Sequence, residues 1–260
     1  MTRKIIIKIG GRAFEAQAGL RELAQDIKSF QGGFFAIVHG GGAEITAALQ
    51  QANRQPQFVA GLRITTAEDI EIVRHVLSSV INTRISGLLE KEGVFCQRMS
   101  GETDSLFLVT PLQKNGKSLG RVGQVTKVNP SVISEAWEKN SVPVISPISA
   151  DDQGVCYNVN ADSAAGALAA AIRCDDLVYF TDVPGVRNGD HFATRLSIAQ
   201  ARHLIAQGTI QGGMIAKMES IFQALESGVQ RVHVGTWAGK GTLHRLLDNT
   251  IANGTTIYRE

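Results

Sequence analysis

Short apolar runs that alternate with helix-like patterns constrain the fold of this chain most strongly. The runs occupy residues 4–9, 34–38, 142–146, 177–181 and 231–235. Helix-like patterns with short, glycine-rich connections separate most of them, at residues 20–30, 43–53, 67–91, 131–139, 162–172, 197–207, 214–227 and 242–249. This alternation is typical of a parallel sheet with helices packed on it. The sequence therefore predicts an α/β fold with a mainly parallel sheet.

Two regions depart from this alternation. Residues 93–128 contain short extended pieces and an Asn115-Gly116 pair, which is typical of a two-residue hairpin turn. A second hairpin is expected near Asp152 and Gly154. We expect both hairpins to be insertions at one edge of the sheet.

The helix expected at residues 67–91 has more apolar positions than one buried stripe needs. Two of its faces should therefore be covered. Two interpretations stay open: a long core helix, or a core helix that also forms a dimer interface.

Composition excludes several classes of partner. The 26 basic and 24 acidic residues give a net charge of +2, so the sequence has no basic footprint for nucleic acid or an anionic membrane. Cys96, Cys156 and Cys174 form no CxxC pair, which favours reduced thiols and a cytoplasmic protein. No secretion signal and no apolar stretch of about 18 residues is present, so we expect neither export nor a membrane span.

Lys8 is unusual because it interrupts the first apolar run and shares a strand face with Ile6. A charge on a covered face is costly without an anionic partner. Gly10 and Gly11 follow this strand, and the next strand ends in the HGGG of residues 39–42. Glycine turns before a helix expose N–H groups that can bind phosphate or carboxylate, although tight turns also need glycine for steric reasons.

A second lysine, Lys217, lies near the start of the helix expected at 214–227. Such a lysine is usually a surface residue, but a cation at the positive end of a helix is unfavourable without an anion nearby. Asp162 is the candidate that could organise both lysines, and its alternative interpretation is a plain helix cap or first-turn acid. Asn158 and Asn160, two residues apart, can point to the same side as Asp162.

Motifs of other chemistries are missing from the sequence. Gly116-Lys117-Ser118 has Pro111 where a phosphate-binding P-loop needs its first glycine. The dinucleotide-binding GxGxxG, the protein-kinase loops, HExxH and GxSxG are also absent. Two lysines beside glycine-lined helix starts instead suit phosphoryl transfer, in which the charge of the migrating group must be neutralised.

Six motifs occur in a characteristic order: KIGG at 8–11, HGGG at 39–42, GLRIT at 61–65, NVNAD at 158–162, TDVPGV at 181–186 and GGMIAK at 212–217. With them the chain resembles the amino acid kinase superfamily over essentially all of its 260 residues, and most closely the members that phosphorylate N-acetyl-L-glutamate. The resemblance implies a three-layer αβα sandwich around a mainly parallel open sheet. It also implies an N-terminal lobe for the amino acid, with a dimerisation helix, at 1–173, and a C-terminal ATP-binding lobe at 174–260.

The resemblance further implies transfer of the γ-phosphoryl group of MgATP to the side-chain carboxylate of N-acetyl-L-glutamate, giving N-acetylglutamyl 5-phosphate in arginine biosynthesis. The expected cofactors are ATP and Mg²⁺, and no residue is assigned as a metal ligand. The expected partners are this small-molecule substrate and a second copy of the chain, without nucleic acid or membrane.

By the same resemblance, Lys8 and Lys217 stabilise the transition state from opposite sides, and Asp162 holds both lysines. The residues expected to bind the amino acid are Gly41, Gly42, Arg63 and Asn158. The residues expected to bind the nucleotide are Gly10, Gly11, Thr181, Asp182, Val183, Pro184, Gly185, Val186, Thr209, Ile210 and Gln211.

The chain departs from the family pattern in two places. The loop at 100–105 matches only in part, and Ala216 stands where proline is common. The extra N-terminal helix of arginine-inhibited hexameric members is not expected, so we expect a homodimer that is insensitive to arginine.

Alternatives remain. One is a kinase for a related N-blocked amino acid, such as an aminoadipate or a carrier-linked glutamate, although GLRIT favours the free N-acetyl amino acid. Another is a non-catalytic nucleotide-binding regulator of the same fold. The presence of Lys8, Asp162 and Lys217 together argues against the regulator, because binding alone needs no paired transition-state cations.

Overall fold

A large sheet forms the centre of the fold. The computed structural model describes residues 2–10, 14, 17–114, 116–250 and 254–260. Within these residues eight strands lie in the order β14-β16-β15-β11-β1-β2-β8-β5, and every neighbouring pair is parallel except β15 and β16. Their bounds are β1 (Arg3–Ile9), β2 (Gly33–His39), β5 (Cys96–Ser100), β8 (Val142–Ser146), β11 (Asp176–Phe180), β14 (Arg195–Ser197), β15 (Arg231–Gly235) and β16 (Gly254–Tyr258). The predicted mainly parallel sheet is confirmed, with the five predicted strands as β1, β2, β8, β11 and β15.

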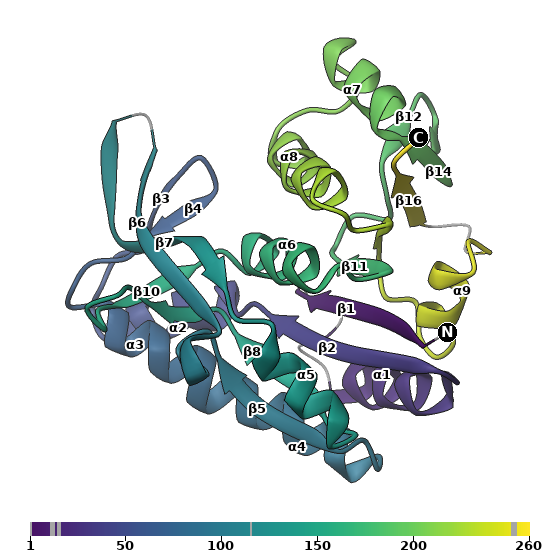
Figure 1. Ribbon diagram of the computed structural model, residues 1–260. Coiled ribbons are helices and arrows are strands. Elements are labelled where there is room, and N and C mark those ends of the chain that lie inside the picture. Colours follow the sequence, from purple (N-terminus) through teal and green to yellow (C-terminus); the bar gives the residue numbers. More distant parts are fainter. Residues whose placement is uncertain (1, 11–13, 15–16, 115, 251–253) are drawn as a thin grey trace.

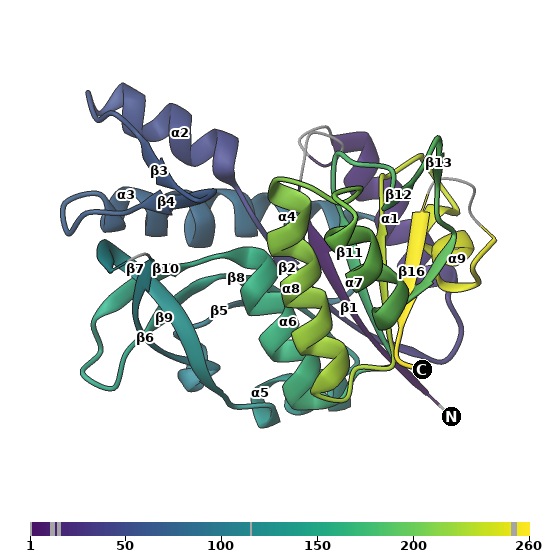
Figure 2. The same ribbon diagram turned by 90° about the horizontal axis from the view of Figure 1, so that it is seen from above.

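Helices cover both faces of this sheet (Figures 1 and 2). One layer consists of α5 (Ser131–Glu138), α6 (Ala161–Ile172), α7 (Ile198–Ala206) and α8 (Gly213–Glu226). The other layer consists of α1 (Gln17–Ser29), α2 (Gly42–Gln51), α3 (Ile70–Arg74), η2 (His75–Ile81), α4 (Asn82–Lys91) and α9 (Thr242–Leu247). The predicted three-layer αβα sandwich is therefore confirmed.

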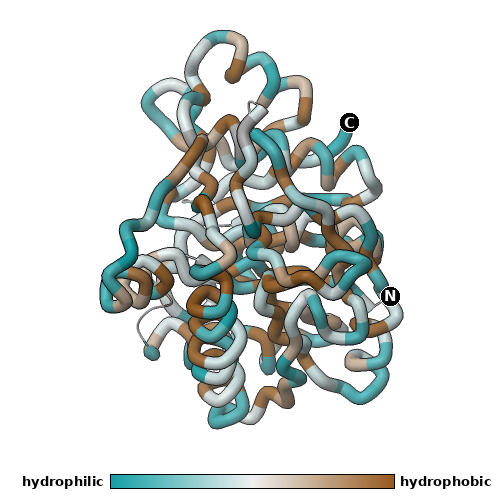
Figure 3. Tube along the Cα trace, turned by 90° about the vertical axis from the view of Figure 1, so that its left-hand side faces the viewer, coloured by the Kyte–Doolittle hydropathy of each residue, from teal (hydrophilic) through white to brown (hydrophobic). Residues whose placement is uncertain are grey.

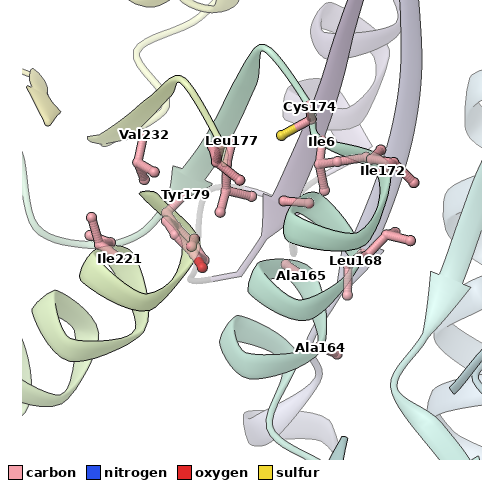
Figure 4. Packing of buried hydrophobic residues seen from close by; sticks show 14 of the residues in the cluster. Ile6, Ala164, Ala165, Leu168, Ile172, Cys174, Leu177, Tyr179, Ile221 and Val232 are labelled. Carbon is pink, nitrogen blue, oxygen red and sulfur yellow. The ribbon is translucent and has the colours of Figure 1, made fainter. Parts of the chain in front are cut away.

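Each face of the sheet has its own hydrophobic core, because successive side chains of a strand point to opposite faces. On β1, Ile6 belongs to the cluster that contains α6 and α8, whereas Ile5 and Ile7 belong to the cluster with α1 and α4. Hydrophobic stretches accordingly gather in the middle of the trace (Figure 3). Small residues such as Ala164 and Ala165 bring α6 close to the sheet (Figure 4).

The predicted hairpins form a separate small sheet. It contains β6 (Phe107–Lys114), β7 (Lys117–Val128), β9 (Ile148–Ala150) and β10 (Cys156–Val159), closed on itself in the order β10-β7-β6-β9. β6 pairs with β7 on either side of residues 115–116, of which Asn115 lies outside the described residues. The short elements that remain are β3 (Gln57–Val59), β4 (Leu62–Ile64), η3 (Thr103–Ser105), β12 (Arg187–Asn188) and β13 (His191–Phe192).

The helix predicted at 67–91 is present as α3, η2 and α4 without interruption, but its centre, η2, is a π-helix. The apolar side chains of this helix pack largely within the chain itself, and the most exposed of them is Val80, at 42%. In the described part of the chain, none of the helices combines the length and the apolar character that crossing a membrane requires.

Candidate active site

Lys8 and Lys217 lie 209 positions apart in the sequence and share one carboxylate in the fold. Lys8 Nζ is 2.8 Å from Asp162 Oδ1, and Lys217 Nζ is 2.5 Å from Asp162 Oδ2. The side chains of the two lysines are only 14% and 13% exposed. The structure therefore supplies the anionic partner that both lysines lack in their local sequence.

The electrostatics of this cluster keep Asp162 ionised. Burial alone would raise the pKa of Asp162, but the charges of Lys8 and Lys217 and their hydrogen bonds outweigh burial and lower it to about 2. One carboxylate between two ammonium groups leaves a positive charge on the cluster. Such a cluster attracts an anion such as a phosphate group.

Local structure explains how the three side chains meet. Lys8 lies near the carboxyl end of β1, on the face that α6 covers, and Asp162 lies in the first turn of α6. Asn160 caps α6, because its side chain accepts hydrogen bonds from the main-chain nitrogens of Asp162 and Ser163 at 2.9 and 3.1 Å. The carboxylate of Asp162 is thus free of the capping role and faces the lysines.

The glycine turns lie at the ends of β1 and β2. A Cβ atom at Gly10 would lie 2.5 Å from Lys8 Nζ, so glycine leaves space for the ammonium group. Gly40 N donates to Ile9 O at 3.1 Å, which joins the two turns. A Cβ atom at Gly41 would collide with Ile81 of η2, whereas the space around Gly42 is open. Gly11, also expected in this site, lies outside the described residues.

Arg63 on β4 points into a cavity of about 220 Å³ that Lys8, Gly41, Asn158 and Asp162 also line. Its Nη2 donates to Gly42 O and to Thr46 Oγ1, both at 2.8 Å. Within the described residues its buried Nη1 has no hydrogen-bond partner. Burial lowers the pKa of Arg63. A buried guanidinium nitrogen with a free donor suits a carboxylate ligand.

Asn158 is fixed on the other side of the same cavity. Its Nδ2 donates to Thr65 Oγ1 at 3.2 Å, and Thr65 follows β4. The predicted amino-acid-binding residues Gly41, Gly42, Arg63 and Asn158 therefore line one cavity together with Lys8 and Asp162.

The segments expected to bind the nucleotide contain both buried and exposed side chains. Val186 and Ile210 are 1% and 3% exposed and belong to the hydrophobic core. Gly185 lies against Thr255, and Thr181 N donates to Gly235 O at 3.0 Å. Asp182 lines a second cavity of about 300 Å³, which Gly10 and Gly41 also border. The remaining side chains of these segments, those of Val183, Pro184, Thr209 and Gln211, lie at least partly at the surface.

Two aromatic residues of the site were not predicted from the sequence. The ring of Phe58 on β3 lies 4.7 Å from the guanidinium carbon of Arg63, although Phe58 is 55% exposed. The ring centroid of Tyr179 on β11 lies 5.0 Å from Lys217 Nζ. The sequence carries no clear signal for either residue, because the exposure of Phe58 is visible only in the structure and Tyr179 looks like any core residue of an apolar strand.

Comparison with known proteins identifies the family of the chain. The model of the amino acid kinase family matches residues 3–236. The acetylglutamate kinase of Ruegeria pomeroyi is 38% identical over 231 residues, which cover 88% of this chain and 79% of that protein. The acetylglutamate kinase of Methanococcoides burtonii is 38% identical over 273 residues, covering 98% and 89%.

Solved structures share the fold. The protein smu.665 from Streptococcus mutans superimposes with a TM-score of 0.78 at 28% identity, covering 99% of both chains. Carbamate kinase from Giardia lamblia bound to AMP-PNP gives a TM-score of 0.70 at 15% identity, covering 100% of this chain and 99% of that one. On the strength of the family match and of these relatives, the chain belongs to the amino acid kinase family, and within it to the acetylglutamate kinases.

Proposed function

We propose that the protein transfers the γ-phosphoryl group of ATP to the side-chain carboxylate of N-acetyl-L-glutamate, as a step of arginine biosynthesis. The identity of 38% with acetylglutamate kinases over most of the chain supports this reaction. The observation that carries the mechanism is the pair of ammonium groups on Asp162, beside a cavity with an open guanidinium donor.

The cavity between β4, the glycine turn and α6 would hold the amino acid. Arg63 Nη1, which lacks a partner among the described residues, would bind the α-carboxylate. Asn158 would hold the same substrate from the opposite wall. The main-chain N–H groups of Gly41 and Gly42 would donate to the reacting side-chain carboxylate and the incoming phosphoryl group.

The reaction joins a carboxylate oxygen of the substrate to the γ-phosphorus of ATP, while the bond from that phosphorus to the bridging oxygen of ADP breaks. Negative charge accumulates on the transferring oxygens and on the leaving oxygen. Lys8, which lines the amino-acid cavity, would stabilise charge on the acceptor side, and Lys217, on α8, would stabilise charge on the nucleotide side. Asp162 would keep both cations in place without neutralising them completely.

The nucleotide would contact the main chain at 181–186 and 209–211 and the turn at Gly10 and Gly11. We assign it to a C-terminal lobe, 174–260, and the amino acid to an N-terminal lobe, 1–173. Among the described residues there is no group of three or more His, Cys, Asp or Glu side chains that could hold a metal ion. Mg²⁺, in this proposal, is bound through the phosphates of ATP, whose charge it partly neutralises.

The protein is proposed to act as a cytoplasmic homodimer through the helix at 67–91. Val80, the exposed apolar residue in the middle of that helix, supports this interface. Cys96, Cys156 and Cys174 are free thiols, which is consistent with a reducing compartment. Light scattering coupled to gel filtration measures the oligomeric state, and Val80→Glu should shift a dimer toward monomer.

The reaction can be tested by trapping its acyl phosphate. Incubation of the protein with ATP, Mg²⁺, N-acetylglutamate and hydroxylamine should give the hydroxamate, and omission of ATP should abolish it. N-acetylaspartate, free glutamate and N-acetylaminoadipate serve as parallel substrates. Faster turnover of N-acetylaminoadipate would reassign the substrate, and absence of turnover with all four acids would favour a nucleotide-binding regulator.

A further inference from the structure

The side chain of Tyr179 on β11 contacts two members of the candidate catalytic cluster, Lys217 and Asp162. Its side chain is completely buried, and its ring centroid lies 5.0 Å from Lys217 Nζ. Its hydroxyl group donates to the main-chain oxygen of Asp162 at 3.1 Å. One buried side chain of β11 therefore contacts both the cation on α8 and the helix turn that carries its counter-ion.

Tyr179 is also part of the hydrophobic core. It points from β11 into the space between α6 and α8, beside Ala165 and Ile221 (Figure 4). Burying a hydroxyl group is unfavourable unless the group forms a hydrogen bond. A Cβ atom at position 166, which is a glycine, would lie 3.4 Å from Tyr179 Oη, so α6 approaches this hydroxyl group closely.

The ring suits the electrostatic demand on Lys217. A cation over an aromatic face is attracted to the negative charge of the ring. A second carboxylate in this place would also attract Lys217, but it would cancel the remaining positive charge of the cluster and repel phosphate. An aromatic ring holds the ammonium group and leaves its full charge for the transferring group.

We propose that Tyr179 is a positioning residue for phosphoryl transfer: its ring holds the Lys217 ammonium group against Asp162, and its hydroxyl group fixes the first turn of α6. This proposal rests on the proposed function, because the role of Lys217 in that reaction defines what is positioned. Tyr179 itself does not touch the reacting atoms.

Two substitutions separate the ring from the hydroxyl group. Tyr179→Phe keeps the ring, and we expect its kcat to stay within about threefold of wild type, the loss of one hydrogen bond to a neutral group. Tyr179→Leu removes the ring, and we expect kcat to fall about tenfold or more, the scale of a desolvated cation–π contact. KM for N-acetylglutamate should stay within about twofold for both variants, because their contacts lie away from Arg63.

Leu177→Val is the matched control for packing. Leu177 lies on the same strand and the same sheet face, is completely buried, and belongs to the same hydrophobic cluster. The Leu177→Val variant should be less stable than wild type in urea unfolding, without a comparable fall in kcat. If Leu177→Val and Tyr179→Leu lower kcat equally at equal stability, Tyr179 is a packing residue and the proposal is wrong. If Tyr179→Phe is as slow as Tyr179→Leu, the ring does not hold Lys217 for catalysis, and the proposal is wrong as well.

A measurement independent of turnover reports the contact itself. After reductive methylation with ¹³C-formaldehyde, the methyl resonance of Lys217, identified by its absence in Lys217→Arg, should be displaced by the ring current of Tyr179. The displacement should persist in Tyr179→Phe and vanish in Tyr179→Leu. An unchanged resonance in Tyr179→Leu would overturn the proposal. Another outcome is that the wild-type protein shows the ring-current shift and yet phosphorylates none of the four acids. That result would establish the contact between Tyr179 and Lys217 but overturn the proposed function, and with it the catalytic part of this proposal.

Discussion

The ion pair with Asp162 changes the interpretation of Lys217 from a surface group to a residue of the candidate site. A lysine at the edge of the apolar stripe of a helix is ordinarily a surface group. In this protein its side chain is 13% exposed and its Nζ is 2.5 Å from the carboxylate of Asp162. A charge this little exposed is costly unless it is paired, and Asp162 supplies the partner.

Replacement of Lys217 tests its proposed role directly. Lys217→Ala should lower kcat by about 10²-fold or more, the scale for removal of one charged group that stabilises a transition state. The hydroxamate assay at saturating substrates measures this change. Arg202→Ala on α7 is a suitable control, because Arg202 pairs with Glu226 on the protein surface, at 59% exposure. A Lys217→Ala variant as fast as this control would show that Lys217 is a structural residue.

At the residue scale, the charged groups of the candidate site could be predicted from the sequence, but the side chains that position them could not. Lys8 and Lys217 could be predicted to meet an anion because each lacked a plausible local partner, and Asp162 was the candidate that could organise both. Tyr179 could not be recognised, because an aromatic residue in an apolar strand is usual in a protein core. The difference between the two cases is that an unpaired charge is costly wherever it lies, whereas a buried ring is not.

The π-helical segment η2 fixes the glycine turn at the end of β2. Leu77 and Ile81 of η2 occupy the space that a side chain at position 41 would need. Ser78 Oγ on the same segment lies 2.6 Å from Ser146 Oγ at the end of β8. A π-helical turn alters which side chains of a helix share a face, and such turns are frequent at functional sites.

The steric fit at this turn gives a prediction with a built-in control. Gly41→Ala should lower the free energy of unfolding by about 1 to 3 kcal/mol, the usual cost of overpacking. Gly42→Ala should cause no such loss, because the space around it is open and alanine favours a helix more than glycine does. Urea unfolding of both variants measures the difference. Equal stability of the two variants would show that η2 yields readily to a methyl group.

At the element scale, prediction succeeded where the periodicity is strong. The five apolar strands and the long helix were recognisable, but β5 and the π-helical form of η2 were not. β5 is the edge strand CQRMS, whose Arg98 donates to Asn82 Oδ1 at 3.2 Å rather than facing a hydrophobic layer. The hairpins were predicted, but their closure into a separate small sheet depends on long-range pairing between β7 and β10, which no local pattern records.

The molecule also contains a buried charge cluster at the opposite end of the sheet from the candidate active site. Asp176, at the start of β11, has no exposed side-chain surface and pairs with Arg3 of β1 at 2.6 Å and with Arg231 of β15 at 3.0 Å. His233 Nε2 lies 2.9 Å from the same carboxylate. Burial would raise the pKa of Asp176, but His233 and the two arginines lower it overall. Three adjacent strands are thus joined by one ionised group.

Removal of this charge should affect stability and leave chemistry intact. Asp176→Asn should lower the free energy of unfolding by about 3 kcal/mol, the lower part of the range for breaking a buried ion pair, since Arg3 and Arg231 remain partly hydrated. Its kcat should equal that of wild type. Asp175→Asn is the matched control, because Asp175 is only half-buried and should cost less than about 1 kcal/mol. A large fall in kcat for Asp176→Asn at a temperature where it is folded would contradict this separation.

The two halves of the lysine–carboxylate cluster differ in how they depend on the rest of the fold. Lys8 and Asp162 come from β1 and α6, and Lys217 comes from α8 in the second half of the chain; α6 packs on both β1 and α8. An outward displacement of α8 would break the ion pair between Lys217 and Asp162 and leave the ion pair between Lys8 and Asp162 intact. In the reaction proposed above, such a movement of α8 would disturb the nucleotide side of the site and spare the acceptor side.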